Sequence, residues 1–232
     1  MIKNIMIVGV GGQGSLLASK ILGRAAMDAG FDVKVSEVHG MSQRGGSVVT
    51  YVRYGDEKIY SPVIGDGQAD VILSFELLEA ARWLRCLKIG GTIVTSTQEI
   101  NPMPVITGAA EYPGELTEKM AALGVDVRAY DTLAIAREAG SEKASNVALI
   151  GLADRVLGFD GEILRQAVLA CVPEKAREIN ARAFDLAYAM ADTAETAAHA
   201  SGLPPRCRKR SACFGLLGGV KNAGAHVDDA ER

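Results

Sequence analysis

The sequence predicts an α/β fold, in which a mostly parallel sheet is covered by helices on both of its faces. Two features of the 232-residue chain support this prediction. Short apolar runs, typical of strands buried on both faces, alternate along the chain with segments of helical periodicity. A glycine-rich turn joins the first apolar run to the first helical segment. Such alternation favours parallel strands connected by helices.

The N-terminal part of the chain predicts a strand, a helix and a second strand. Residues 5–8 are a continuous apolar run, and residues 15–29 carry apolar side chains spaced as on one buried helix face. Gly30 follows this helix at a position where a left-handed residue commonly ends one. Residues 32–38 alternate between polar and apolar side chains and therefore predict the next strand.

The middle of the chain predicts a hairpin, which interrupts the alternation of strands and helices. Residues 47–54 are rich in β-prone side chains, and we expect them to pair with residues 58–60 across the turn that begins at Gly55. Residues 71–73 predict a further buried strand, and the helix after it is expected over 76–87.

The remaining elements follow the same logic. Gly90 and Gly91 are expected to turn the chain into a strand at 92–95. We then expect a helix, a last strand and a run of helices, at 115–123, at 125–130 and from about 132 onward, the longest helix spanning about 173–201.

The composition changes after Pro204 and Pro205. Four basic residues occur within five positions, from Arg206 to Arg210. We expect 204–232 to be a flexible basic tail. The domain itself is then 1–203, with a C-terminal helical extension from about residue 132.

Overall composition excludes several classes of protein. Hydrophobic residues make up 48% and charged residues 23% of the chain, with a formal net charge of -3, which excludes disorder for its bulk. The pI of about 5.7 provides no basic field to attract nucleic acid. No apolar run approaches the roughly 18 residues of a membrane span, and no signal-peptide cleavage region precedes the first strand. We therefore expect a cytoplasmic protein that binds neither nucleic acid nor a membrane.

The first candidate site is the glycine turn, residues 9–14. Its spacing, G-x-G-x-x-G between a strand and a helix, is typical of Rossmann-like nucleotide-binding folds. Glycines permit a tight turn, and the start of the helix offers free N–H groups to an anion. The alternative is that the glycines only let strand and helix pack closely. The candidate cofactor-binding residues are Gly9, Gly11, Gly12, Gln13 and Gly14.

The second candidate site is the polar loop, residues 39–47. It follows the second predicted strand, at the end of a sheet where open α/β folds bind ligands. Arg44 is suited to a phosphate or carboxylate, and backbone N–H groups near the glycines can form an anion-binding concavity. The alternative is a loop that only contacts a partner chain. The candidates are His39, Gln43, Arg44, Gly45, Gly46 and Ser47.

The two motifs together are specific. Residues 7–14 (IVGVGGQG) and 36–48 (SEVHGMSQRGGSV) resemble the gamma-type domain of the 2-oxoacid:ferredoxin oxidoreductases, and within it the small (beta) subunits of the indolepyruvate-dependent enzymes. The resemblance covers about 1–195. Shorter segments that agree with it are 61–62, 75–76, 146–151 and 175–184.

The resemblance implies an accessory subunit that is inactive alone. In the family, a large (alpha) partner subunit binds thiamine diphosphate with Mg²⁺ and carries [4Fe-4S] clusters. The complex converts a 2-oxoacid, here an arylpyruvate such as indolepyruvate, into acyl-CoA and CO₂, and it passes the electrons to ferredoxin. The cysteines agree with this division of labour, because no CxxC pair occurs and we expect no metal site in this chain.

The resemblance also assigns roles to the candidate residues. As a hypothesis, the glycine turn and the polar loop form one surface that faces the partner's active site and takes coenzyme A. Arg44 is then the charge partner of an anion, with Gln43 and Ser47 as hydrogen-bond donors. His39 is a positioning or proton-relay candidate for catalysis.

Two other functions stay open. A stand-alone NAD-dependent oxidoreductase would use the glycine turn together with Glu37, at the end of the second predicted strand, as the ribose ligand. A purely structural subunit would use the glycines for packing and the polar loop for docking.

Overall fold

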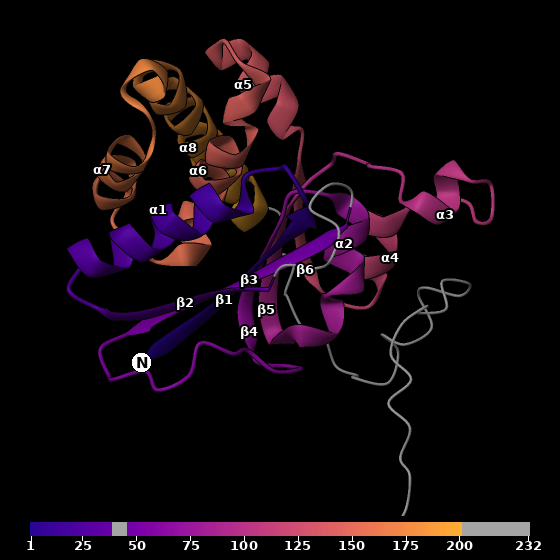
Figure 1. The fold of residues 1–232 in the computed structure, drawn as a ribbon, viewed down its shortest axis with the longest axis horizontal. Helices are drawn as coiled ribbons and strands as arrows, with labels where there is room; N and C mark the ends of the chain where they lie inside the picture. The colour runs from indigo at the N-terminus through magenta and orange to yellow at the C-terminus, as the bar shows by residue number, and fades with distance from the viewer. Residues whose placement is uncertain (39–45, 201–232) are drawn as a thin grey trace, which may run out of the picture.

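The computed structural model describes residues 1–38 and 46–200. They form a six-stranded sheet flanked by helices (Figure 1). The strands are β1 (Ile2–Val10), β2 (Asp32–Val38), β3 (Ser47–Gly55), β4 (Ala69–Ser74), β5 (Leu87–Ser96) and β6 (Asp126–Tyr130). The helices are α1 (Ser15–Asp28), α2 (Leu77–Arg82), α3 (Met103–Ile106), α4 (Leu116–Ala122), α5 (Thr132–Ala139), α6 (Ser145–Leu157), α7 (Gly161–Cys171) and α8 (Arg177–Ala200).

The strands are ordered β2-β3-β1-β4-β5-β6 across the sheet. β3 runs antiparallel to both of its neighbours, β1 and β2, whereas β1, β4, β5 and β6 are mutually parallel. β2 therefore points in the same direction as β1. The prediction of a mostly parallel sheet is confirmed.

The two faces of the sheet have separate cores. Ile5 and Ile7 of β1 pack with apolar residues of α1, α6, α7 and α8, whereas Met6 and Val8 pack with α2 and α4 on the opposite face. This alternation is the two-residue period of a strand buried on both sides. Figure 1 shows the larger helical layer, α1 with α5 to α8, on one side of the sheet, and α2 and α4 on the other. The predicted helical cover on both faces is confirmed.

The predicted pairing of residues 47–54 with 58–60 is wrong. Residues 58–60 form no strand, and β3 instead lies between β1 and β2, paired with both along its length. As an inner strand, β3 buries Val49 in one core and Val52 in the other. A hairpin exposed on one edge could not bury both faces, so the burial of apolar side chains explains the observed pairing.

The turn predicted at Gly90 and Gly91 lies inside β5, which begins at Leu87. The pairing of β5 with β4 shifts register at this point. Gly90 has a φ of +82°, and a Cβ on Gly91 would lie 2.9 Å from the carbonyl oxygen of Asp70. Both positions therefore require glycine, as in an irregularity within a strand rather than in a turn before one.

Residues 132–200, the described part of the chain after β6, are mainly helical, as predicted. α6 contacts β4 and β5 directly, and α8 packs on α6. The two helices approach closely, because a Cβ on Gly151 would lie 2.9 Å from the carbonyl oxygen of Phe184. These helices therefore complete one core of the sheet. The expected boundary at 203 and the tail 204–232 lie outside the described residues.

Candidate functional site

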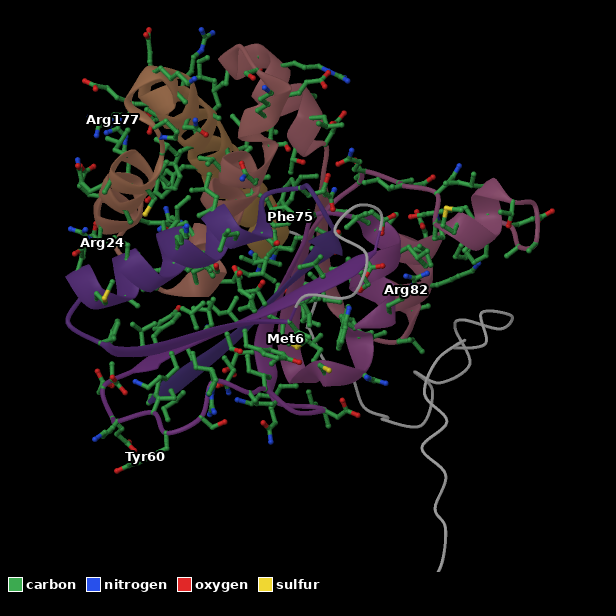
Figure 2. All side chains as sticks on the ribbon, in the orientation of Figure 1. Met6, Arg24, Tyr60, Phe75, Arg82 and Arg177 are labelled. Carbon is green, nitrogen blue, oxygen red and sulfur yellow. The ribbon has the colours of Figure 1, made fainter. Side chains whose placement is uncertain are left out.

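The glycine turn lies at the carboxyl ends of the parallel strands. β1, β4 and β5 all end at this edge of the sheet, and α1 begins there. Figure 2 shows Phe75, the residue after β4, at the end of the sheet from which α1 starts, and Arg82 on the neighbouring α2. Open α/β sheets bind ligands at this edge.

A backbone hydrogen bond joins the two predicted motifs. The N–H of Gly11, in the glycine turn, donates to the carbonyl oxygen of Gly46, at the end of the polar loop, at 3.0 Å. Ser47 is the first residue of β3 and lies opposite Val10, the last residue of β1. The structure therefore brings Gly46 and Ser47 to the glycine turn. The other polar-loop candidates, His39, Gln43, Arg44 and Gly45, lie outside the described residues.

The conformation of the glycine turn requires glycine at two positions. Gly12 and Gly14 have φ angles of +102° and +87°, in the left-handed region. A Cβ on Gly14 would also lie 2.3 Å from Nδ2 of Asn146, the buried second residue of α6. The Gly14 carbonyl accepts a hydrogen bond from this amide at 3.5 Å. The turn is thus packed against α6 on one side, while a Cβ on Gly12 would meet nothing within 4 Å.

α1 presents an uncapped N-terminus at the site. Gly14 occupies the cap position without a side-chain hydrogen bond, and the first turn contains no acidic residue. The first N–H groups of a helix have no partner within the helix, and they carry its positive dipole end. This terminus is therefore electrostatically suited to an anion, as the sequence predicts.

The side chain of Gln13 holds the turn to two neighbouring strands. Its Oε1 accepts the N–H of Val10 at 2.7 Å, and its Nε2 donates to the carbonyl oxygen of Phe75 at 2.8 Å and to Oε1 of Gln98 at 3.0 Å. The two amide protons are both engaged within the chain. Gln13 therefore fixes the ends of β1, β4 and β5 relative to one another.

Ser47 is held by a buried carboxylate. Its Oγ donates to Oε2 of Glu79 on α2, whose Oε1 accepts Nη1 of Arg82 at 2.7 Å. Glu79 is only 2% exposed. Burial raises the pKa of Glu79, while the hydrogen bond from Ser47 and the charge of Arg82 oppose this rise. Glu79 thus anchors the start of β3, next to the point where the polar loop returns to the sheet.

A second buried carboxylate, Glu76, fixes the segment that follows β5. Its Oε2 caps α2 by accepting the N–H of Glu79 at 2.8 Å. Its Oε1 accepts the N–H of Ile100 at 3.1 Å and the hydroxyl of Tyr112 at 2.6 Å. Burial, followed by the hydrogen bond to Glu76, raises the pKa of Tyr112 above its usual range. Residues 97–112 are therefore held near both ends by one side chain.

Sequence reasoning missed Glu76, Glu79 and Gln98. None belongs to a spaced motif, and acidic residues at the start of a short helix are usually solvated. Phe75-Glu76 agrees with the family that the sequence resembles, but this agreement assigns Glu76 no role. The preference for carboxylates near a helix N-terminus was the one available signal, and it indicates a cap rather than burial.

Glu37 is placed poorly for the NAD alternative. β3 lies between β1 and β2, so Glu37 stands two strands away from the strand that leads into the glycine turn. At about 4.8 Å per strand spacing, this separation is roughly 10 Å. Oε1 of Glu37 accepts the hydroxyl of Ser19 of α1 at 3.0 Å. In the dinucleotide-binding arrangement the second strand is adjacent to the first, so the geometry disfavours that alternative.

The described part of the chain shows neither a metal-ligand cluster nor a membrane-spanning helix. Among the side chains of residues 1–38 and 46–191, no group of three or more His, Cys, Asp or Glu is arranged to hold a metal ion. Every helix of residues 1–38 and 46–200 is too short or too polar to span a membrane.

Comparison with known proteins identifies the family. The family model described as "Pyruvate ferredoxin/flavodoxin oxidoreductase" matches residues 4–190. Indolepyruvate oxidoreductase subunit IorB of Pyrococcus horikoshii is 45% identical over 188 residues, which cover 79% of this chain and 93% of that protein.

Solved structures share the fold. The gamma subunit of a keto/oxoacid ferredoxin oxidoreductase from Geobacter sulfurreducens matches 84% of this chain and 98% of its own, with a TM-score of 0.65 and 25% identity. The 2-oxoglutarate:ferredoxin oxidoreductase from Magnetococcus marinus, with 2-oxoglutarate, coenzyme A and succinyl-CoA bound, matches 83% of this chain and 31% of its own, with a TM-score of 0.62 and 21% identity.

The resemblance inferred from the glycine turn and the polar loop is confirmed by these matches. The family model spans most of the described residues, and the similar curated protein is matched over nearly its whole length. The chain belongs to the pyruvate ferredoxin/flavodoxin oxidoreductase family.

Proposed function

We propose that this chain is the small subunit of an indolepyruvate:ferredoxin oxidoreductase, acting with a large subunit to form acyl-CoA and CO₂. The name of the 45% identical relative supports indolepyruvate as the substrate. The proposal includes a cytoplasmic complex with ferredoxin as electron acceptor. In it, thiamine diphosphate with Mg²⁺ in the large subunit supplies the carbon chemistry, and [4Fe-4S] clusters in that subunit carry single electrons.

The contribution of this chain is a binding surface for coenzyme A at the carboxyl edge of the sheet. One observation carries this part of the proposal: the Gly11 to Gly46 hydrogen bond, which joins the glycine turn to the polar loop. The uncapped N-terminus of α1 adds N–H groups suited to a phosphate of coenzyme A. Arg44 and Gln43 of the polar loop are proposed to complete this surface, with His39 positioning the reacting groups. The Magnetococcus marinus protein, of which a part amounting to 31% of its chain shares this fold, has coenzyme A bound.

The test is reconstitution of the complex. The chain is co-expressed with the large subunit identified by co-purification, and reduction of ferredoxin is followed with indolepyruvate and with coenzyme A varied separately. Saturable dependence on both, with the acyl-CoA product identified by mass spectrometry, supports the proposal. Turnover that does not depend on the concentration of coenzyme A contradicts the proposed binding role. Turnover with other 2-oxoacids but not with indolepyruvate contradicts the proposed substrate.

A further inference from the structure

The orientation of the Gln13 amide is fixed by backbone groups. A backbone N–H can only donate and a backbone carbonyl can only accept. Because Val10 N–H lies 2.7 Å from one end of the amide, that end is Oε1. Because the Phe75 carbonyl lies 2.8 Å from the other end, that end is Nε2. No other orientation satisfies both neighbours.

The orientation of the Gln98 amide follows from that of Gln13. Nε2 of Gln13 donates to Gln98 at 3.0 Å, so the atom of Gln98 that faces it is Oε1. The backbone of Gln98 is also anchored, since its N–H donates to Oγ of Ser96 at 3.2 Å and its carbonyl accepts the N–H of Leu77 at 3.0 Å. The side chain is therefore held with its oxygen inward and its Nε2 group outward.

The outward Nε2 of Gln98 has no acceptor among the described residues and is not among their buried unsatisfied atoms. It is thus a solvent-accessible NH₂ group whose direction is set by the protein. Gln98 follows the end of β5 and contacts Gln13 of the glycine turn, so it belongs to the edge of the sheet where α1 begins. A donor oriented in advance loses little conformational entropy when it binds a ligand.

We infer that Gln98 donates a hydrogen bond from Nε2 to an anionic oxygen of the ligand bound at the glycine turn, and that Gln13 is the residue that positions it. The inference rests on the proposed function, in which this ligand is coenzyme A and the oxygen belongs to one of its phosphates. It makes Gln98 a specificity-determining residue, because an outward NH₂ group favours a ligand atom that accepts a hydrogen bond, whereas an outward amide oxygen would not.

Gln98→Glu is the most selective change available. The carboxylate that this substitution introduces still accepts the hydrogen bond from Gln13, so the contact within the chain is kept. Only the outward group changes, from a donor to a negatively charged acceptor. A residue with a purely structural role would tolerate this change, whereas a residue that faces an anionic ligand would not.

Gln68→Glu is a matched control. Oε1 of Gln68 accepts the N–H of Gly65 at 3.0 Å, and the side chain is exposed beside the start of β4, at the opposite end of that strand. The substitution makes the same chemical change and keeps the same kind of contact, away from the glycine turn.

The experiment uses the complex with the large subunit and measures the KM for coenzyme A, kcat and the melting temperature. The expected result for Gln98→Glu is a rise in the KM for coenzyme A of about tenfold or more, with kcat within about twofold and an unchanged melting temperature. Gln13→Glu supplies the second variant: it removes the donor to both Gln98 and the Phe75 carbonyl, and the Gln98 amide is then expected to rotate and turn its oxygen outward. It should raise the same KM although Gln13 does not contact the ligand.

Each outcome decides the inference. A tenfold rise in Gln98→Glu, with Gln68→Glu equal to wild type, supports it. A KM in Gln98→Glu within about twofold of the control overturns it. A wild-type complex whose turnover does not depend on coenzyme A refutes the proposed function and the inference with it. This result is distinguishable from failure of the inference alone, because it is measured on the wild type and not on a variant.

Discussion

Gly11 donates its backbone N–H to the carbonyl oxygen of Gly46 at 3.0 Å, across 35 positions of sequence. This bond ties the turn after β1 to the residue that precedes β3, and β3 pairs antiparallel with β1 beside it. The glycine turn and the last two residues of the polar loop, Gly46 and Ser47, therefore lie at one edge of the sheet. The bond involves only main-chain atoms, so it depends on the backbone geometry of the turn, which glycine permits.

We predict that Gly14→Ala destabilises the chain more than Gly12→Ala. Both residues have a positive φ, but a Cβ at Gly14 also meets the Asn146 amide at 2.3 Å, whereas one at Gly12 meets nothing within 4 Å. Backbone strain costs about 1–2 kcal/mol for either variant. We expect the clash to add about 1–2 kcal/mol in Gly14→Ala.

Urea denaturation of both variants checks this prediction. Since both residues have a positive φ, Gly12→Ala serves as the control for backbone strain. Equal unfolding free energies for the two variants would show that the packing of the turn against α6 does not restrict position 14.

We predict that Glu79→Gln lowers stability by about 1–3 kcal/mol, because it breaks the pair with Arg82 while leaving a polar group buried. Burial raises the pKa of Glu79 in the folded chain above its ordinary 4.5. The folded state therefore binds more protons than the unfolded state between 4.5 and the folded value. Wild-type stability falls as the pH rises through that window, and the variant lacks this contribution.

The difference in stability between wild type and Glu79→Gln should thus shrink as the pH rises from about 4.5 toward neutrality. Denaturation at several pH values measures it, and the exposed Glu118→Gln on α4 is the control, with an expected effect below about 0.5 kcal/mol. A difference that grows with pH would mean that the Arg82 pair, rather than burial, dominates the titration of Glu79.

We predict that Tyr112→Phe costs about 1–2 kcal/mol. The hydroxyl of Tyr112 donates to Glu76 and accepts the N–H of Leu78, and both of these groups would lose a partner. Tyr60 is 86% exposed and lies at the far end of the sheet (Figure 2), so Tyr60→Phe is the control and should be neutral. Thermal melts of the two variants give the comparison, and a neutral Tyr112→Phe would disprove the bridging role of its hydroxyl.

The local parts of the fold could be predicted from the sequence. The apolar run of β1, the glycine turn and the periodicity of α1 lie within a few residues of one another, so their pattern alone indicates a strand, a turn and a helix. The pairing of β3 could not be predicted in this way. A β-prone segment pairs equally well with a near neighbour or a distant strand, and the burial of both faces, which decides the matter here, depends on the assembled sheet.

The candidate site was predictable to a similar extent. Gly11, Gly12 and Gly14 could be identified because the backbone of a tight turn requires glycine at fixed positions, which gives a recognisable spacing in the sequence. Glu79 and Gln98 act through contacts with Ser47 and Gln13 that are 32 and 85 positions away in sequence. No local pattern marks such residues, so only the structure shows them.

We predict that Arg44→Ala in the complex raises the KM for coenzyme A about tenfold or weakens assembly with the large subunit, because the guanidinium proposed to pair with an anion is lost. The isolated chain should keep its melting temperature. Steady-state kinetics and co-purification measure the two effects. Unchanged kinetics together with unchanged assembly would remove the polar loop from the proposed binding surface.

The most direct test of the whole account compares the chain alone with the chain bound to its large subunit, at equal concentrations, in an assay of ferredoxin reduction by indolepyruvate and coenzyme A. The account predicts turnover only when both polypeptides are present, and no response of the isolated chain to NAD. Turnover by the isolated chain at an enzymatic rate, with any acceptor, would contradict it.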